Sequence, residues 1–409
     1  MKILEADYIL TCNDNFDIIR DGAICFDENI IEVGTQDTLE KKYPQAEVTK
    51  APKNTLIMPG LINPHVHLEF SSNRTLLKYG SFIPWLDSVI QKRDDIVGDS
   101  TMECMTKELN AMLFCGTTSL GAISSFGGEL EACAKASQRV VFFNEVLGSR
   151  PDTVDVMFGD FRSRLHQSFD CASNRFFPAI SIHAPYSTHP ILAKNALSIA
   201  KKERLNVSTH FMESPAERAW LDSGTGEFAQ FFNNFLPNAR PLSSAMEYLE
   251  LFDGISTLFT HCTQATPEEL NKIINEGSFI THCPVSNRLL GVGKLDIETL
   301  MQKDVAFTLG TDGLSSNISL SLWDEMRFAL MIHDKSSLEE ISKNLIKAST
   351  CNAAKALNLA CGKIEKGLCA DMIALTLPQH VEDEKQIPIQ LILHTKKTHW
   401  TIIDGEIKC

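Results

Sequence analysis

The stretch Pro59–Phe70, PGLINPHVHLEF, contains an apolar run that ends in two histidines, His65 and His67. Such a run predicts a buried β-strand, and alternate residues of a strand point to the same face. Both imidazoles can therefore reach one cation. Pro59 and Gly60 allow the chain to pass from one sheet into another just before the strand. The stretch predicts the start of a new domain and part of a metal site.

Apolar, β-branched runs alternate with helical patterns in the middle of the chain, from this stretch onward. Helical periodicity is found in Ile191–Glu203, Pro267–Glu276 and Leu322–Ile332. Eight runs are expected to be strands: Leu56–Ile62, Thr117–Ile123, Val140–Leu147, Phe177–His183, Leu205–His210, Ser256–His261, Ser278–His282 and Val305–Asp312. Eight βα units over about 300 residues predict an α/β fold, a closed (β/α)8 TIM barrel. A doubly wound open sheet is the alternative, but no G-x-G-x-x-G follows the first run.

The two ends of the chain have short alternating runs that predict strands without helices between them. These runs are Lys2–Cys12, Gly22–Phe26, Ile30–Gly34, Gly367–Leu377 and Thr398–Ile407, the last with a hairpin turn at Asp404-Gly405. We expect both termini to combine into one small β-sandwich. The expected domains are 1–58 for its N-terminal part, 59–360 for the barrel and 361–409 for its C-terminal part.

Composition narrows the class of protein. The formal net charge of −14 argues against nucleic acid or an anionic membrane as a partner. The N-terminus has no signal-peptide pattern and no apolar run is long enough to span a membrane, so we expect a cytoplasmic protein. The 12 cysteines include no C-x-x-C pair and are expected to be reduced thiols. The oligomeric state stays open, with a homodimer as one candidate.

Histidines and acids gather at the carboxyl ends of the expected strands, which is where barrel enzymes carry their chemistry. Together with His65 and His67, the residues His210 and Asp312 predict a site for one divalent metal ion. Imidazole and carboxylate ligands favour Zn²⁺, with Fe²⁺ as the alternative. Such an ion lowers the pKa of a bound water to roughly 7. Segments 139–150 and 177–187 contain no lysine that could bridge a second ion, so one ion is expected.

Two further residues beside this site are expected to move protons. Glu213, three residues after His210, could protonate a ring nitrogen, whereas the alternative is a solvated loop glutamate. His261 could take a proton from water or be a hydrogen-bonded core residue, and Asp312 could accept a proton during turnover. His183 is expected to contact the substrate. For His282 a structural role and a site role stay open.

These motifs resemble the amidohydrolase superfamily. The matching strings are PGLINPHVHLEFS, SIHAPYSTHP, VSTHFMESPAE, LFTHCT, THCPVSNRLLG and LGTDGLSSNISLSLWDEMR, and with the terminal sandwich they cover essentially the whole chain. The TDGLSSN and HCPVSN strings look like the branch of adenosine-type deaminases, and YGSFIPWL and SNRLLG look most like aminofutalosine deaminases. When the functional residues of the family are transferred to this sequence, the resemblance implies that His65, His67, His210 and Asp312 are the metal ligands. It implies that Glu213, His261 and Asp312 are the catalytic residues.

The resemblance implies hydrolytic conversion of a 6-aminopurine nucleoside to its 6-oxo form with release of ammonia. The expected reaction is 6-amino-6-deoxyfutalosine to futalosine in menaquinone biosynthesis. Trp85, in the lid segment Tyr79–Leu86, and His183 are expected to contact the nucleoside. The benzoate-type carboxylate of that substrate needs a cation, for which the candidates are Arg150, Arg288 and Arg74. The lid lacks the acid that often holds the ribose in such deaminases, which leaves Glu69 as a candidate.

Other members of the superfamily remain alternatives. They are a deaminase for S-adenosylhomocysteine, methylthioadenosine or guanine, and a triazine chlorohydrolase or aminohydrolase. A non-catalytic scaffold is disfavoured because all the expected ligands and the acid are present. The cytidine-type zinc deaminases need P-C-x-x-C, which this sequence lacks.

Overall fold

The computed structural model describes the chain from Met1 to Cys409 apart from Asn73 and residues 235–237. Its internal contacts divide the chain into two compact units. One contains Met1–Pro64, Leu109–Leu120 and Ser321–Cys409, and the other contains His65–Glu108 and Gly121–Leu320. Among the described residues, no helix has the length and apolar character needed to cross a membrane. The domain bounds proposed from the sequence remain a prediction.

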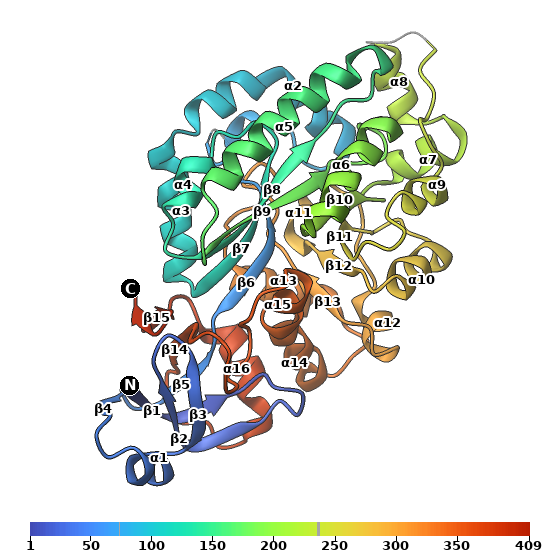
Figure 1. The fold of residues 1–409 in the computed structure, drawn as a ribbon. Coiled ribbons are helices and arrows are strands. Elements are labelled where there is room, and N and C mark those ends of the chain that lie inside the picture. Colours follow the sequence, from blue (N-terminus) through green and yellow to red (C-terminus); the bar gives the residue numbers. More distant parts are fainter. Residues whose placement is uncertain (73, 235–237) are drawn as a thin grey trace. The chain divides into compact units, whose positions relative to one another are not determined.

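Strands from both ends of the chain combine, as the sequence predicts, and they form one mixed sheet (Figure 1). Its order is β16-β15-β14-β5-β1-β2-β3, and β4 pairs with β1. The strands are β1 (Lys2–Leu10), β2 (Ile18–Phe26), β3 (Ile30–Thr35), β4 (Glu47–Lys50), β5 (Thr55–Pro59), β14 (Met372–Thr376), β15 (Trp400–Ile403) and β16 (Glu406–Ile407).

Both faces of this sheet are buried, because successive residues of its strands enter different apolar clusters. Ile3 and Cys25 pack on one face with Leu39 of α1 (Gln36–Lys42), whereas Leu4 and Ile24 pack on the other. Antiparallel pairing of β1 with β2 sets Ile3 opposite Cys25 and Leu4 opposite Ile24. A one-residue slip would exchange the two faces, so burial fixes the register.

The expected hairpin turn at Asp404-Gly405 is confirmed. It joins β15 to β16, and φ is 52° at Asp404 and 70° at Gly405. Two successive positive φ angles are the requirement of the tight hairpin turn that Asp-Gly favours. A Cβ at position 405 would lie 1.8 Å from the carbonyl oxygen of Asp27, so this position also lacks room for a side chain.

The remaining eight strands form the parallel, nearly closed barrel that the sequence predicts. Their order is β13-β12-β11-β10-β9-β8-β7-β6. They are β6 (Leu61–Val66), β7 (Thr117–Ser124), β8 (Arg139–Val146), β9 (Phe176–Ile182), β10 (Val207–Phe211), β11 (Thr257–His261), β12 (Phe279–His282) and β13 (Phe307–Leu309). The backbone N–H of Asp312 donates to the carbonyl of His65 at 3.1 Å, so the chain after the last strand meets the first.

The first expected strand, Leu56–Ile62, was wrong in its bounds. Thr55–Pro59 belongs to the terminal sheet, and the barrel strand is Leu61–Val66, so His65 lies within the strand rather than after it. The chain changes sheets at Gly60, where an added Cβ would lie 2.1 Å from the hydroxyl of Thr118. The last strand is also shorter than expected, Phe307–Leu309 rather than Val305–Asp312.

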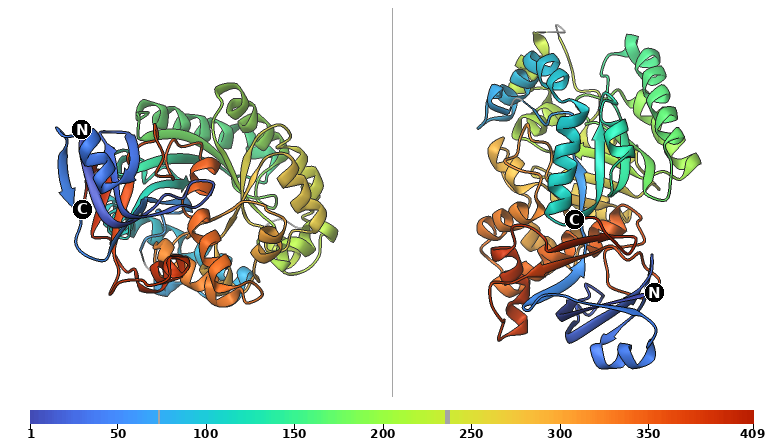
Figure 2. Two further views of the ribbon diagram at one scale, coloured as in Figure 1. Left: turned by 90° about the horizontal axis from the view of Figure 1, so that it is seen from below. Right: turned by 90° about the vertical axis from the view of Figure 1, so that its left-hand side faces the viewer.

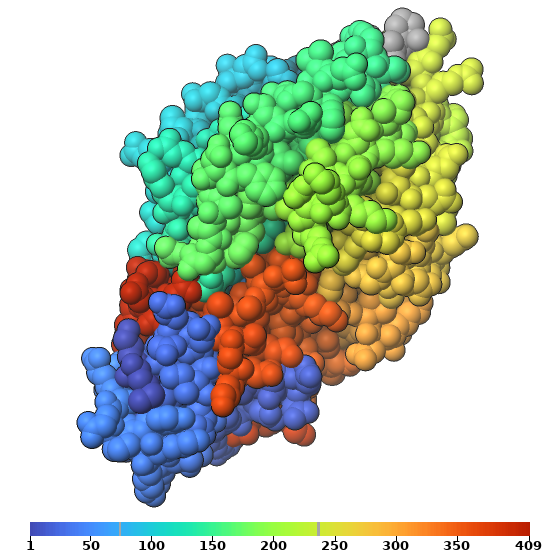
Figure 3. All heavy atoms as spheres, viewed as in Figure 1, coloured from blue at the N-terminus to red at the C-terminus, as the bar shows by residue number. Residues whose placement is uncertain are grey.

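Helices of the second unit surround the strands, as Figure 2 shows in green and yellow. Two of them, α5 and α6, pack side by side on the face seen in Figure 3. The expected helices are found, with the second ending one residue early. The helices besides α1 are α2 (Phe82–Asp99), α3 (Met102–Phe114), α4 (Leu130–Ala134), α5 (Val154–Asp170), α6 (Pro190–Glu203), α7 (Pro215–Ser223), α8 (Glu227–Asn233), α9 (Ala245–Glu250), α10 (Pro267–Asn275), α11 (Pro284–Leu289), α12 (Ile297–Gln302), α13 (Leu322–Ile332), α14 (Leu338–Ala348), α15 (Cys351–Ala356) and α16 (Ile387–His394). Short 3-10 turns span Arg74–Leu76, Pro151–Thr153 and Glu384–Gln386.

Candidate active site

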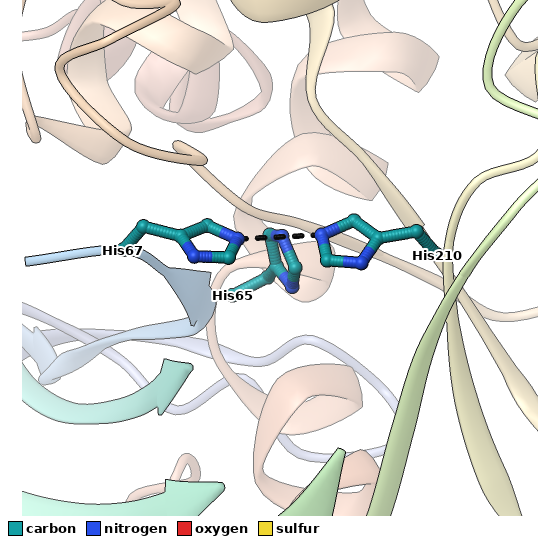
Figure 4. A group of neighbouring side chains, drawn as sticks. All are labelled: His65, His67 and His210. Atoms are coloured by element: carbon teal, nitrogen blue, oxygen red, sulfur yellow. Dashed lines mark hydrogen bonds between the residues drawn. The ribbon is translucent and has the colours of Figure 1, made fainter. Parts of the chain in front are cut away.

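Three imidazoles converge at the carboxyl ends of β6 and β10. His65 lies in β6, His67 follows it, and His210 lies in β10. Their rings point toward one another in Figure 4, and the Nε2 atoms of His67 and His210 are 3.3 Å apart. One ring nitrogen from each of the three lies within 4.8 Å of the others. The barrel therefore brings together histidines that are far apart in the chain.

The carboxylate of Asp312 completes this group from the chain after β13. Its Oδ1 atom lies 3.8 Å from Nε2 of His65 and 3.6 Å from Nε2 of His67. The backbone N–H of Gly313 donates to the same oxygen at 2.8 Å. The other oxygen, Oδ2, accepts from the hydroxyls of Ser286 at 2.7 Å and Ser316 at 3.0 Å. These bonds hold the carboxylate with one oxygen toward the imidazoles.

The chemistry of this donor set fits a divalent cation. Burial lowers the pKa of His65, His67 and His210, so the rings are neutral and carry a lone pair for a metal. Nδ1 of His210 donates to the carbonyl of His183 at 2.9 Å, so Nε2 carries the lone pair and can accept a cation. Nδ1 of His65 contacts the hydroxyl of Thr260 at 3.2 Å. Neutral imidazoles around one carboxylate suit zinc or ferrous iron better than magnesium or calcium.

Glu213 and His261 form a second pair beside these ligands. Nε2 of His261 lies 3.6 Å from a carboxyl oxygen of Glu213, and one ligand atom from each lies within 4.8 Å of one from Asp312. Burial, followed by the charges of Asp312 and Glu217, raises the pKa of Glu213 well above its ordinary value. The raised pKa favours the protonated form of the Glu213 carboxyl.

The environment of His261 has the opposite effect on its protonation. Burial lowers the pKa of His261 to about 4, so the ring is neutral. Nδ1 contacts the side-chain oxygen of Asn287 at 2.9 Å, and because that oxygen only accepts, Nδ1 carries the proton. The lone pair on Nε2 then faces Glu213. The pair combines a carboxyl whose protonated form is favoured with a neutral imidazole, a combination that suits general acid–base chemistry.

The backbone is strained at this rim. Four residues other than glycine have positive φ there: Met212 at 48°, His261 at 74°, Cys262 at 50° and Asp312 at 59°. Such conformations are costly for residues with a side chain and cluster at functional sites. Here they direct His261 and Asp312 toward the same space as the histidine ligands.

Sequence reasoning missed Glu217, which positions Glu213. The Glu217 carboxylate accepts the backbone N–H groups of Met212 at 3.1 Å and Glu213 at 2.8 Å. Burial raises its pKa to about 7. The string Ser214-Pro215-Ala216-Glu217 has the spacing of a helix-capping box, and Ser214 does cap α7. That spacing could have identified the glutamate, but not its bonds to the preceding turn.

Glu145 is a second residue that was missed. It lies on β8, is fully buried, and accepts from the hydroxyls of Ser125 at 2.6 Å and Ser181 at 3.3 Å. One of its oxygens lies 3.8 Å from Nδ1 of His210. Its position near the end of the expected strand Val140–Leu147 was the available signal.

These side chains line one cavity of about 470 Å³. Its lining includes His67, His183, His210, Glu213, His261 and Asp312. Trp85 on α2 also lines it, and its indole N–H donates to the carbonyl of Ser315 at 2.9 Å. The cavity therefore unites most of the expected metal ligands, the proton-transfer pair and both expected nucleoside contacts.

The three arginines that were candidates for binding the carboxylate of the substrate do not share one location. Arg150 lines the cavity and donates to both carboxylate oxygens of Asp152. Arg288 is exposed on α11 and is not among the residues that line the cavity. The side chain of Arg74 lies outside the described part of the chain. Glu69 does not line the cavity either, because its carboxylate accepts the backbone N–H groups of Ser125 and Phe126.

The fold and the site define the class of protein, and sequence comparison agrees. The chain belongs to the amidohydrolase family, which it matches over residues 56–408. It is 45% identical over 406 residues, 99% of each chain, to an aminodeoxyfutalosine deaminase of a Nitratiruptor species. It is 32% identical over 410 residues, again 99% of each chain, to an adenosine deaminase of Helicobacter pylori.

A solved structure also matches over full length. The crystal structure of Helicobacter pylori aminofutalosine deaminase in complex with methylthio-coformycin has a TM-score of 0.95 with this chain. The two are 32% identical, and the match covers 100% of both chains. The chain therefore has the fold of a known deaminase, including both the barrel and the sheet built from the termini.

Proposed function

We propose that this protein is a metal-dependent aminohydrolase that converts 6-amino-6-deoxyfutalosine to futalosine with release of ammonia. The observation that carries the proposal is the approach of Glu213 and His261 to 3.6 Å, next to three imidazoles and a carboxylate whose ligand atoms converge. The full-length likeness to the Nitratiruptor deaminase supports this choice of substrate. A small nucleoside substrate is consistent with an enzyme of the cytoplasm.

In this proposal His65, His67, His210 and Asp312 hold one divalent ion, for which zinc is preferred and ferrous iron is the alternative. When bound, the ion activates a water molecule for attack on carbon. The burial of these residues and the hydrogen bonds of His65 to Thr260 and of Asp312 to Ser286 and Ser316 support the assignment because they orient both side chains.

The chain's own residues supply the proton transfers. Glu213 donates its proton to N1 of the purine as water adds to C6, and His261 accepts a proton from that water. The bond between C6 and the amino nitrogen then breaks, and the amino group leaves as ammonia with the proton that His261 returns. The C6 hydroxyl gives up its remaining proton through Asp312 to the Glu213 carboxylate, which forms the 6-oxo group and restores the acid. The net change is loss of ammonia and gain of the oxygen of water at C6. His183 and Trp85 would hold the nucleoside in this orientation.

A steady-state comparison of substrates tests the proposal. Metal-replete protein would be assayed for ammonia release from aminofutalosine, methylthioadenosine, S-adenosylhomocysteine, adenosine and guanine. We expect the highest kcat/KM with aminofutalosine. A higher kcat/KM for methylthioadenosine or adenosine would show that aminofutalosine is not the preferred substrate. A lack of ammonia release from every compound tested would refute the assignment of purine deaminase activity.

A further inference from the structure

One face of helix α2 lines the cavity along most of its length. Phe82, Trp85, Leu86, Val89, Ile90 and Arg93 all contribute to the lining. Their spacing of three and four residues places them on a single helical face. Five of the six are apolar or aromatic, and the last is a cation. The cavity wall formed by α2 is therefore apolar from Phe82 to Ile90, and Arg93 places a positive charge at its end.

This face points from the catalytic residues outward. Trp85 is tied by its indole N–H to the carbonyl of Ser315, three residues from Asp312. Arg93 lies eight residues further along the helix, which is about 12 Å along the helix axis. The acids among the described lining residues, Glu145, Glu213 and Asp312, lie at the strand ends. The cavity thus has an acidic end and a cation far from it.

The surroundings of Arg93 suit a flat anionic group. Its guanidinium lies 5.7 Å from the centre of the Phe126 ring, and both residues line the cavity. Phe126 is 44% exposed and Ile90 is 47% exposed, so apolar surface stays uncovered beside the cation. An aromatic ring bound there would cover this surface and place a ring carboxylate beside the guanidinium.

Arg93 is also more available for a ligand than the other arginine in the cavity. Arg150 donates from Nε at 3.0 Å and from a terminal nitrogen at 2.5 Å to the two oxygens of Asp152, so two hydrogen bonds tie this guanidinium to one carboxylate. Arg93 pairs with Oδ1 of the neighbouring Asp94, at 3.2 Å, and the side chain of Asp94 is 90% exposed. A pair that open to water is weak and is readily exchanged for another carboxylate.

We infer that α2 and Phe126 form a subsite for an aryl carboxylate, in which Arg93 binds the carboxylate of the substrate's 5′ substituent. The inference rests on the proposed function and adds to it the residue that recognises the tail. The sequence had offered Arg150, Arg288 and Arg74 for this task. We choose Arg93 instead because it lies at the end of the apolar face of α2. Its exposed pair with Asp94 can also be exchanged for a carboxylate of the substrate.

The test compares aminofutalosine with its carboxylate methyl ester, which differs from it only in the charged group. The readout is the ratio of kcat/KM for the acid to kcat/KM for the ester. We expect the wild-type protein to prefer the acid by about tenfold, the scale of one charge-assisted pair. Arg93→Gln should bring the ratio near one, mainly through KM for the acid, and Arg93→Lys should keep part of the preference.

Two matched variants serve as controls. Lys92→Gln removes the same charge from the neighbouring position of α2, where Lys92 is not among the lining residues, and should keep the wild-type ratio. Arg150→Gln should keep it too. A wild-type ratio near one, a wild-type ratio in Arg93→Gln, or a loss of preference in Arg150→Gln alone would each overturn the inference. Failure of the wild-type protein to deaminate aminofutalosine at all would instead refute the proposed function.

Discussion

Replacing Glu213 by glutamine is the most direct test of the site. The substitution keeps the shape of a side chain that is only 6% exposed, and it removes the acidic proton. An amide N–H can still form a hydrogen bond to N1 of the purine, so KM should change little. It cannot transfer a proton, so kcat should fall by about 10²- to 10⁴-fold, the contribution of a positioned general acid. This corresponds to about 2.7–5.4 kcal/mol of transition-state stabilisation.

The geometry also predicts what this variant keeps. The carboxyl of Glu213 is not among the four proposed ligand groups, so the purified variant should contain as much metal as the wild-type protein. The assay is steady-state ammonia release from aminofutalosine, combined with elemental analysis of the same samples. A variant that retains more than about a tenth of the wild-type kcat would refute Glu213 as the proton donor.

Glu69→Gln provides the matched control for this experiment. Glu69 is as buried as Glu213, at 2% exposed, and burial also raises its pKa well above the ordinary value. It accepts backbone N–H groups of Ser125 and Phe126 and does not line the cavity. Its substitution should leave kcat within about threefold of wild type because it takes no part in proton transfer. An equal loss in both variants would mean that any buried carboxyl near the barrel rim supports activity.

The remaining predictions concern the metal, the fold and pH. Asp312→Ala should lose most of the bound metal and all measurable activity, because one of four ligands is gone; metal content close to wild type would contradict its role as a ligand. Removal of metal by a chelator should abolish ammonia release, and separate addition of Zn²⁺ and Fe²⁺ to the metal-free protein should show which ion restores it. Gly405→Ala should lower the free energy of unfolding by more than about 2 kcal/mol, measured by denaturant titration, because of its positive φ and the nearby carbonyl of Asp27. Burial raises the pKa of Glu129 from 4.5 to about 7, so the unfolded chain releases this proton first and stability is lost as the pH rises from 4.5 through 7. The free energy of unfolding of Glu129→Gln should therefore exceed that of wild type by up to about 3 kcal/mol at about pH 8 and equal it at about pH 4.5. Denaturant titration at both pH values measures this, and equal unfolding midpoints for the two proteins at both would contradict it.

Local pattern predicted the architecture well because barrels convert sequence order into spatial order. Each of the eight apolar runs was short, and parallel strands place all their carboxyl ends on one rim. Histidines that end different strands, such as His67, His210 and His261, therefore had to approach one another. The main error lay in the run Leu56–Ile62. Its residues are apolar throughout, so hydropathy merged the end of the terminal sheet with the first barrel strand, although Pro59 and Gly60 had indicated a passage between sheets at this point.

The candidate site was predicted less evenly than the fold. Residues fixed to strand ends could be placed from the sequence, whereas the cations could not. Arg93 and Arg288 both lie on helices, and which of them faces the cavity depends on how each helix is rotated against its neighbours. Trp85 was found only because its string matched a family motif. Glu217 and Glu145 were missed because their partners are backbone N–H groups and hydroxyls from other segments.

The sequence by itself determined the strand order, the tight turn at Asp404-Gly405 and the set of side chains that meet at the barrel rim, because each follows from short-range periodicity and turn chemistry. Only the tertiary structure decided the charges of those side chains. Burial favours the proton on Glu213 and disfavours it on His261 because it penalises the charged form of each, and that burial arises from segments far away in the chain. The tertiary structure likewise decided that Arg93 ends the apolar wall of the cavity, since helix packing rather than helix periodicity fixes which face turns inward.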